Sequence, residues 1–233
     1  MRPGAVRAGW VVKGRIVMAE YGIRHLQNSL PGIAGVLFDP DACEALRGLD
    51  CASIACYPWD GTGYCPEARA YVGWDAAGLQ VLLCAREETI QAAETRVGGA
   101  VCVDSCLEFF LQPFPDADAR YLNVEVNPAG VAHIGLGEGR APRRVWVEVP
   151  AGFNIETSRH VGAWWAVRYT IPAAFLREIY GQDLLPGAVL RGNFYTCDES
   201  IHPHFGAWHP VIAPQPDFHR PECFGALRLA DEV

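Results

Sequence analysis

The sequence lacks three features that would assign it quickly to a function class: a closely spaced cysteine pair, a basic run and a long apolar stretch. None of the nine cysteines forms a C-x-x-C pair, so neither a zinc ribbon nor a thioredoxin-type redox motif is supported. There is no run of about five basic residues. The formal net charge of -8 argues against a nucleic-acid partner, because such partners normally require a basic face. No segment approaches about 18 consecutive apolar residues, so no membrane-spanning helix is expected.

The N-terminal segment also lacks the uninterrupted apolar core of a secretory signal, because Lys13 and Arg15 fall inside the candidate stretch. We therefore expect residues 1–17 to be an extension before a single domain over residues 18–233, a length that can bury one core. Cysteines within apolar runs, such as Cys84, are typical of free thiols in a reducing compartment. These features predict a cytoplasmic protein, with an exported protein that carries some disulfides as the alternative.

Short β-strands separated by turns are expected along most of the chain, because 17 prolines and 24 glycines punctuate it throughout. Two hairpins are predicted, over residues 68–85 with a turn at 75–78 and over residues 121–136 with a turn at 127–130. Further strands are expected at residues 51–56, 107–113, 145–149, 163–171, 189–197 and 224–229.

Helical signals are few. Pro172 suits a helix start and Gly181 suits a helix end, so a short helix is predicted over residues 172–180. Residues 41–47 are expected to form a short helix or a single turn. The fold class predicted from these elements is all-β: an antiparallel β-sandwich, jelly-roll-like, with one short helix near residues 172–180.

Two of the expected strands have one apolar and one polar face. On the first, Glu108 and Phe110 point to the same side, and on the second Tyr121, Asn123 and Glu125 do so. Leucine, valine and phenylalanine residues occupy the opposite sides and are candidates for the core. Carboxyl and amide groups accept and donate the hydrogen bonds that sugar hydroxyls require, so the polar sides predict a ligand-binding face.

The C-terminal stretch from Asn193 to Gly225 is rich in aromatic and polar residues. Trp208 and Phe218 lie in proline-rich loops, and an aromatic ring on a rigid loop suits the apolar face of a pyranose. The alternative is that both rings pack their loops onto the domain. His202 and His204 could share a metal ion if their segment is extended, although hydrogen bonding within the loop is favoured.

Five motifs occur in an order that resembles one known family. The sequence is similar, over residues 20 to 230, to the stand-alone bacterial proteins of the carbohydrate-binding module family 9 type. The resemblance implies a non-catalytic β-sandwich with calcium at structural positions. In the xylanase-attached members of the family, two aromatic rings clamp a terminal sugar and a few polar residues bind its hydroxyls. The motifs are Asp104–Phe110, Tyr121–Gly130, Asn193–Cys197, Pro203–Trp208 and Pro216–Gly225.

The resemblance also implies a set of binding residues. By motif, the positions of the polar contacts are occupied by Glu108, Asn123 and Tyr195. Phe218 falls at one of the clamp-ring positions, and Trp208 lies close by in sequence. The second clamp position is occupied by Cys102, which has no stacking face. Loss of one ring, worth about 1–3 kcal/mol on the scale of base stacking, would weaken affinity by about tenfold or more. The predicted carbohydrate-binding residues are Glu108, Asn123, Tyr195, Trp208, Phe218 and Arg220.

Two other functions remain open from the sequence. The domain could have lost sugar binding and serve as an intracellular interaction or scaffold module, as Cys102 and the free cysteines suggest. It could also be a glycoside hydrolase, since Glu108 could form a carboxylate pair with Glu125 or Asp104 at the required separation of about 5–10 Å. Calcium is implied by the resemblance, although no dense Asp/Asn/Gly loop marks a site, and Asp116 and Asp118 are the nearest candidates.

Overall fold

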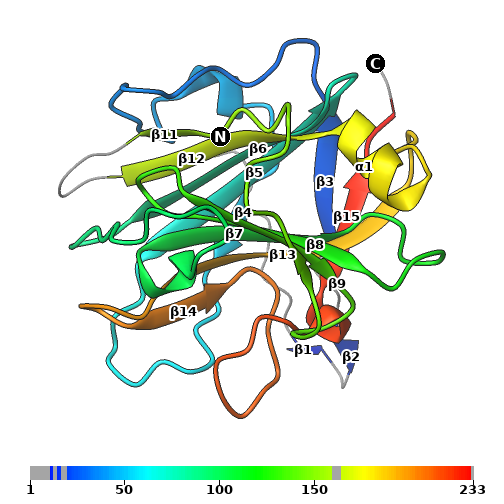
Figure 1. Cartoon of the computed structure of the whole chain (residues 1–233). Helices are drawn as coiled ribbons and strands as arrows, with labels where there is room; N and C mark the ends of the chain where they lie inside the picture. Colours follow the sequence, from blue (N-terminus) through cyan, green and yellow to red (C-terminus); the bar gives the residue numbers. More distant parts are fainter. Residues whose placement is uncertain (1–10, 13–14, 17–19, 159–163, 232–233) are drawn as a thin grey trace.

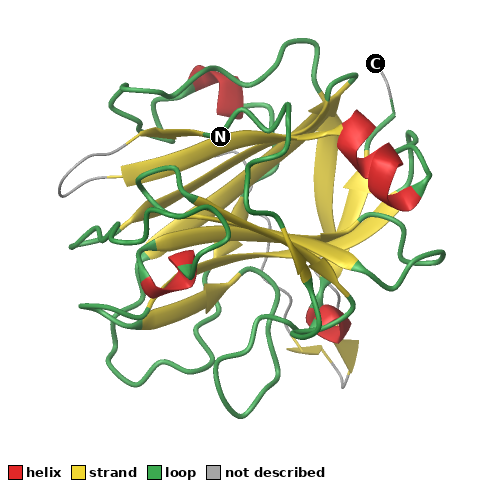
Figure 2. Cartoon of the chain, viewed as in Figure 1, coloured by secondary structure: helices red, strands yellow, loops and turns green. Residues whose placement is uncertain are grey.

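Strands are the dominant regular structure, and nearly all of them belong to one curled sheet (Figures 1 and 2). The computed structural model describes residues 11–12, 15–16, 20–158 and 164–231. The predicted extension over residues 1–17 therefore lies largely outside the described residues; within it, β1 (Val11–Val12) pairs with β2 (Arg15–Ile16).

The large sheet has the strand order β10-β9-β8-β7-β13-β15-β3-β5-β6-β12-β11, with β14 added beside β13 and β4 beside β5. Figure 1 shows β5, β6 and β12 in one layer and β7, β8 and β13 in the other, with β3 and β15 at the side where the sheet turns from one layer to the next. The strands are β3 (Glu20–His25), β4 (Ala52–Ile54), β5 (Glu67–Asp75), β6 (Gly78–Arg86), β7 (Cys106–Gln112), β8 (Tyr121–Val126), β9 (Ala132–Gly137), β10 (Arg144–Val145), β11 (Glu156–Ser158), β12 (Trp164–Pro172), β13 (Val189–Asp198), β14 (His204–Ala207) and β15 (Gly225–Leu229).

Both predicted hairpins are confirmed. Strand β5 pairs antiparallel with β6, and β8 pairs antiparallel with β9. The β5–β6 turn depends on Gly78, which has φ of 136°, a value that favours glycine. A Cβ atom there would lie 2.1 Å from the carbonyl oxygen of Ile171, so no other residue fits the turn as it is built.

The prediction of a purely antiparallel sheet is wrong at β3. This strand pairs in parallel with β15 on one side and with β5 on the other, with Tyr21 opposite Leu227 and Arg24 opposite Gly73. The sheet is therefore mixed. Alternating residues determine which face of a strand is buried, but they do not identify its neighbours or their direction.

The predicted strand over residues 145–149 is also wrong. Only Arg144 and Val145 form β10, and one further backbone bond joins the Trp146 N–H to the Ile134 carbonyl. After that the chain leaves the sheet edge, and the side chain of Val147 is 80% exposed. Beyond Trp146 the alternating sequence therefore has no partner strand among the described residues.

The predicted helix is confirmed as α1 (Ala173–Tyr180), which lies at one end of the two layers (Figure 2). It is preceded by Pro172 and ends at Gly181, whose φ of 69° is left-handed. The segment 41–47 contains only the 3-10 turn η1 (Glu44–Leu46); similar turns are η2 (Val101–Val103) and η3 (Pro221–Cys223). No helix among the described residues is both long and apolar enough to cross a membrane.

The main core lies between the two layers, as the alternating faces predict. Residues of β7 and β8 that were expected to face inward are fully or almost fully buried there, together with residues of β6 and β12. A second cluster of buried residues covers the opposite face of β7, β8 and β13, beneath the C-terminal loop. The inward-facing residues of β7 and β8 are Leu107, Phe109, Leu111, Leu122, Val124 and Val126.

Candidate functional site

A pocket of about 140 Å³ opens on the face of β7, β8 and β13 that points away from the main core. It lies between these strands and the C-terminal loop that contains Phe218. Its walls combine carboxyl groups, aromatic rings, thiols and one guanidinium. The lining residues are Cys102, Glu108, Phe110, Glu125, Arg140, Cys197, Glu199, Phe205, Pro216, Asp217, Phe218 and His219.

The strand register brings the polar residues of three strands together. Glu108 lies opposite Glu125 on one side and opposite Tyr195 on the other, while Phe110 lies opposite Asn123. Opposed residues of neighbouring strands point to the same face of a sheet. The structure thus confirms the polar side of each strand, and its register places Glu108 and Phe110 on the same face of the sheet as Asn123 and Glu125.

Glu108 and Glu125, which face each other in the pocket, differ in what favours their ionised forms. Glu108 is 2% exposed, and burial and the facing carboxylate of Glu125 raise its pKa well above the usual range. Its Oε1 accepts a hydrogen bond from Cys197 Sγ at 3.1 Å. Burial also raises the pKa of Glu125, but His133 and a hydrogen bond from Asn123 act against the shift. We therefore assign the proton to Glu108, which makes its carboxyl both a donor and an acceptor.

Asn123 supports the pocket from behind. It is fully buried, it donates from Nδ2 to Glu125 Oε1 at 2.7 Å, and its Oδ1 accepts from Arg143. A Cβ atom at Gly135 would lie 2.5 Å from Asn123 Oδ1, so the glycine provides the room for this amide. Asn123 therefore orients Glu125 and does not line the pocket.

The aromatic wall is a corner made of two rings. Phe218 and Phe205 have ring centroids 6.3 Å apart and planes inclined at 68°. Phe218 is stacked on Tyr195, whose hydroxyl donates to the Phe218 carbonyl oxygen at 3.2 Å. Tyr195 is thus the support beneath Phe218. Cys102, at the position where the resemblance implied a second clamp ring, also lines the pocket and offers a thiol.

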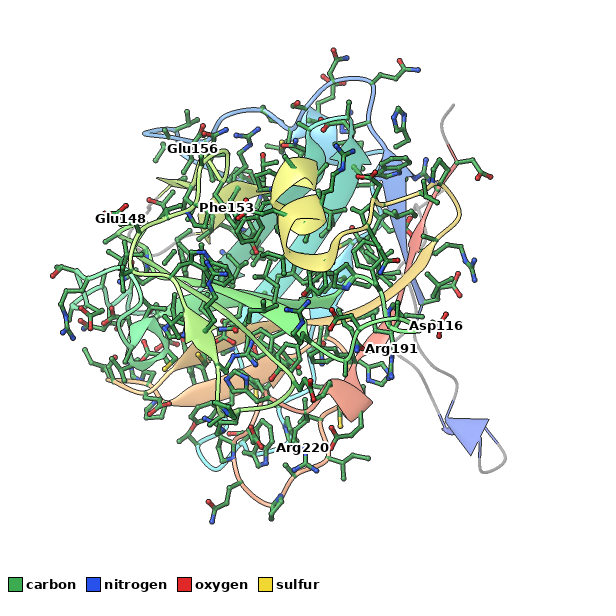
Figure 3. All side chains as sticks on the ribbon, turned by 45° about the vertical axis from the view of Figure 1, so that its right-hand side comes forward. Asp116, Glu148, Phe153, Glu156, Arg191 and Arg220 are labelled. Atoms are coloured by element: carbon green, nitrogen blue, oxygen red, sulfur yellow. The ribbon has the colours of Figure 1, made fainter. Side chains whose placement is uncertain are left out.

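Like Asn123 and Tyr195, the other two predicted residues, Trp208 and Arg220, do not line the pocket. Trp208 belongs to the main core, where its ring centroid lies 5.6 Å from that of Phe194 and 6.2 Å from that of Tyr21. Arg220 is on the outer surface, at the lower edge of Figure 3. Its Nε donates to Glu222 at 2.8 Å, so its guanidinium is held beside the pocket and not within it.

Sequence reasoning missed several residues that line the pocket, among them Arg140, Asp217 and His219. Arg140 lies in the segment after β9 and donates to Asp217 at 2.8 Å, which joins that segment to the C-terminal loop. Burial, Arg143 and Arg140 lower the pKa of His219 to about 3, so its ring is neutral. The available signal was position, because Asp217 and His219 flank Phe218 within one motif.

The loop that the sequence offered for calcium does not fit that ion. Asp118 forms an ion pair with Arg120 at 2.6 Å, and Nε of the same arginine donates to Asp118 Oδ1. Asp116 is exposed in the same loop. Oxygens already engaged by a guanidinium are poor ligands for a hard cation that requires several free oxygens.

Comparison with known proteins identifies a family and a fold. The sequence profile of carbohydrate-binding family 9 matches residues 42–229. No curated protein sequence matches the chain. A structure from Bacteroides uniformis, of a protein to which carbohydrate binding is ascribed, is 24% identical and has a TM-score of 0.72, with 90% of this chain and 98% of that chain covered.

Two further structures are of a family 9 carbohydrate-binding module from Caldicellulosiruptor kristjanssonii. One is in complex with cellotriose and the other with glucose. Both are 13% identical to this chain with a TM-score of 0.61, and the matches cover 92% of this chain and 95% and 97% of theirs. At these identities the likeness concerns the fold.

Proposed function

Because this chain belongs to carbohydrate-binding family 9, we propose that it binds carbohydrate, without cleaving it, in the pocket between Glu108 and Phe218. The observation that carries the proposal is the meeting of a buried carboxyl wall and an aromatic corner in one pocket of a family member. Sugar hydroxyls would bond to Glu108, Glu125 and Arg140, and the apolar face of the ring would rest on Phe218 or Phe205.

The size of the pocket favours one sugar ring. Its volume of about 140 Å³ is close to that of the cavity of about 150 Å³ that admits benzene in another protein. A pyranose is a six-membered ring of comparable size, so the pocket would hold a monosaccharide or the end of a chain. Glucose and cellotriose, which are bound by structures of the same fold, are therefore the first ligands to test.

The placement of the two glutamates supports binding over hydrolysis. Glu108 and Glu125 are directly opposed on the neighbouring strands β7 and β8, so they stand side by side on one wall. A hydrolase needs its two carboxyl groups on either side of the scissile bond. We also propose that the two layers form a jelly-roll-like sandwich, which the shared core between β6, β12, β7 and β8 supports.

Calorimetric titration with glucose and with cellotriose tests the proposal. We expect both sugars to bind with similar affinity, because one ring fills the pocket. Glu108→Ala should weaken binding by about 5–150-fold, since leaving the buried sugar hydroxyl groups without their partner costs about 1–3 kcal/mol. Glu108→Gln keeps a donor and an acceptor and should remain within a few-fold of the wild type.

The matched control is Glu44→Ala, because Glu44 is exposed on η1 and does not line the pocket. Equal loss in the Glu44 and Glu108 variants would mean that the pocket is not the binding site. Sugar consumption during the titration, which disappears in Glu108→Gln, would instead indicate a hydrolase.

One observation favours a second function, that of an interaction module which no longer binds sugar. Phe218 is only 8% exposed, and Cys102, where the family resemblance implied a second ring, contributes a thiol to the pocket lining. A folded wild-type protein that binds neither sugar at millimolar concentration would support this alternative and reject the first proposal.

A further inference from the structure

Three metal-ligating side chains converge at the floor of the pocket. Cys106 and Cys197 are directly opposed on β7 and β13, and Glu108 lies two residues along β7 on the same face. One sulfur or oxygen atom from each of the three lies within 4.8 Å of the others. All three side chains are buried, and both cysteines are free thiols. We propose that Cys106, Cys197 and Glu108 form a binding site for a soft divalent metal ion of the zinc class.

The spacing of the donor atoms suits a tetrahedral ion. Metal–sulfur bonds of about 2.3 Å and metal–oxygen bonds of about 2.0–2.2 Å place the donors of such a site about 3.6–3.8 Å apart. Cys197 Sγ lies 3.1 Å from Glu108 Oε1 and the third donor is within 4.8 Å of both. Small side-chain rotations therefore suffice to bring the three donors to bonding distance.

The ion has a route to this site and a place for a fourth ligand. Cys197 and Glu108 line the pocket, whereas Cys106 lies beneath them. Three protein ligands with an open fourth position are the arrangement of zinc sites that also bind water or a substrate. The fourth ligand here would be a water molecule or a hydroxyl group within the pocket.

Two thiolates determine the class of ion. Thiolate ligands select zinc, cadmium or copper(I), whereas calcium and magnesium require oxygen ligands. Binding replaces the protons of the two thiols and of the Glu108 carboxyl group, and these protons pass to the solvent. The bound unit of M²⁺ with three anionic ligands carries one negative charge, which Arg140 at the same pocket helps to balance.

The metal site differs from the proposed sugar site in chemistry and in its test. It uses two thiols that the sugar proposal does not need, and it shares only Glu108 with it. Metal binding is measured without any sugar, so its failure would leave the carbohydrate proposal untouched, and failure of sugar binding would leave the metal site untouched.

The experiment is a cadmium titration of the reduced, metal-free full chain, followed by the ultraviolet charge-transfer absorption of cadmium thiolate. We expect one ion per chain, displacement of cadmium by a large excess of zinc and no displacement by the same excess of calcium. Cys197→Ser and Cys106→Ser should each weaken cadmium binding by more than about 100-fold, because loss of an outer-shell partner alone costs about 10–100-fold. Glu108→Gln, which keeps both thiols, should weaken binding while retaining the absorption band at saturating cadmium.

The matched control is Cys84→Ser, because Cys84 is an equally buried free thiol of β6 in a different cluster. Its cadmium titration should match that of the wild type. If one serine variant does not fold, as judged by circular dichroism, the other variant and Glu108→Gln carry the test. The proposal is overturned if the wild type gives no band, or if the band and affinity are unchanged in the Cys197 or Cys106 variant.

Discussion

The rings of Tyr195 and Phe218 are stacked, with centroids 4.0 Å apart and planes inclined at 12°. Tyr195 lies on strand β13, between β7 and β15, and Phe218 lies in the C-terminal loop. The stack fixes the loop to the sheet and covers one face of the phenylalanine ring. Only the remaining face and edge of Phe218 are available to a ligand, which makes it a preorganised wall of the pocket.

Phe218→Ala should therefore abolish most sugar affinity. Loss of one stacking ring is expected to cost about 1–3 kcal/mol, or about 5–150-fold in the dissociation constant, on the scale of base stacking. Phe38→Ala is the matched control, because Phe38 is equally buried at 7% exposure but belongs to a different cluster. Calorimetry checks both variants, and equal affinities in the two would remove Phe218 from the site.

Cys102→Trp should strengthen sugar binding. Cys102 lines the pocket and is half-buried, so a tryptophan there can present a ring to the bound sugar. A gain of about tenfold corresponds to about 1.4 kcal/mol, within the range of one stacking contact. Cys65→Trp, at an exposed cysteine outside the pocket, is the control. A folded Cys102 variant with unchanged or lower affinity would mean that this position does not lie across the sugar.

Trp208→Ala should lower stability and not act through a ligand contact. The ring is packed between Phe194 and Tyr21 in the main core, so its removal should reduce the free energy of unfolding by about 3–5 kcal/mol. Urea unfolding measures this change. Sugar affinity of the protein that remains folded should be unchanged, and a selective loss of affinity with normal stability would return Trp208 to the binding site.

The sequence was sufficient for features that depend on local periodicity. The hairpin β8–β9, the helix α1 and the inward faces of β7 and β8 were all predicted, because alternating residues and turn residues act within a few positions. The polar side of each strand followed from the same alternation, whereas the register that aligns Glu108 with the side of Asn123 came from the structure.

Features that depend on distant segments were not predictable in this way. The parallel pairing of β3 joins segments near both ends of the chain, and no local pattern encodes it. Trp208 was assigned to the binding surface because aromatic rings near prolines suit both roles. In the structure the lack of a side chain at Gly225 makes room for that ring, since a Cβ atom there would lie 2.5 Å from Trp208 Cζ3.

Glu87 should make the stability of the protein depend on pH. It is 2% exposed, its Oε1 accepts from Trp165 Nε1 at 3.1 Å, and burial raises its pKa from 4.5 to about 7. His204 Nε2 lies 3.9 Å from Glu87 Oε1, and the charge of Asp198 also raises the pKa of Glu87. Between these two pH values the folded state holds a proton that the unfolded state has lost. The stabilisation by protonated Glu87 is therefore fully present below about pH 4.5. As the pH rises through 7 it is lost, and the free energy of unfolding falls by about 3 kcal/mol.

Glu87→Gln keeps the shape and the acceptor for Trp165 but has no proton to lose. We expect the variant to be more stable than the wild type by up to about 3 kcal/mol at pH 8, with the difference shrinking towards pH 5. His204 is present in both proteins, so the difference between their urea-unfolding free energies isolates Glu87. Glu88→Gln, at the exposed neighbour, should follow the wild type at every pH. A Glu87 variant whose stability differs from the wild type by a constant amount from pH 5 to 8 would show that the carboxyl does not titrate in this range.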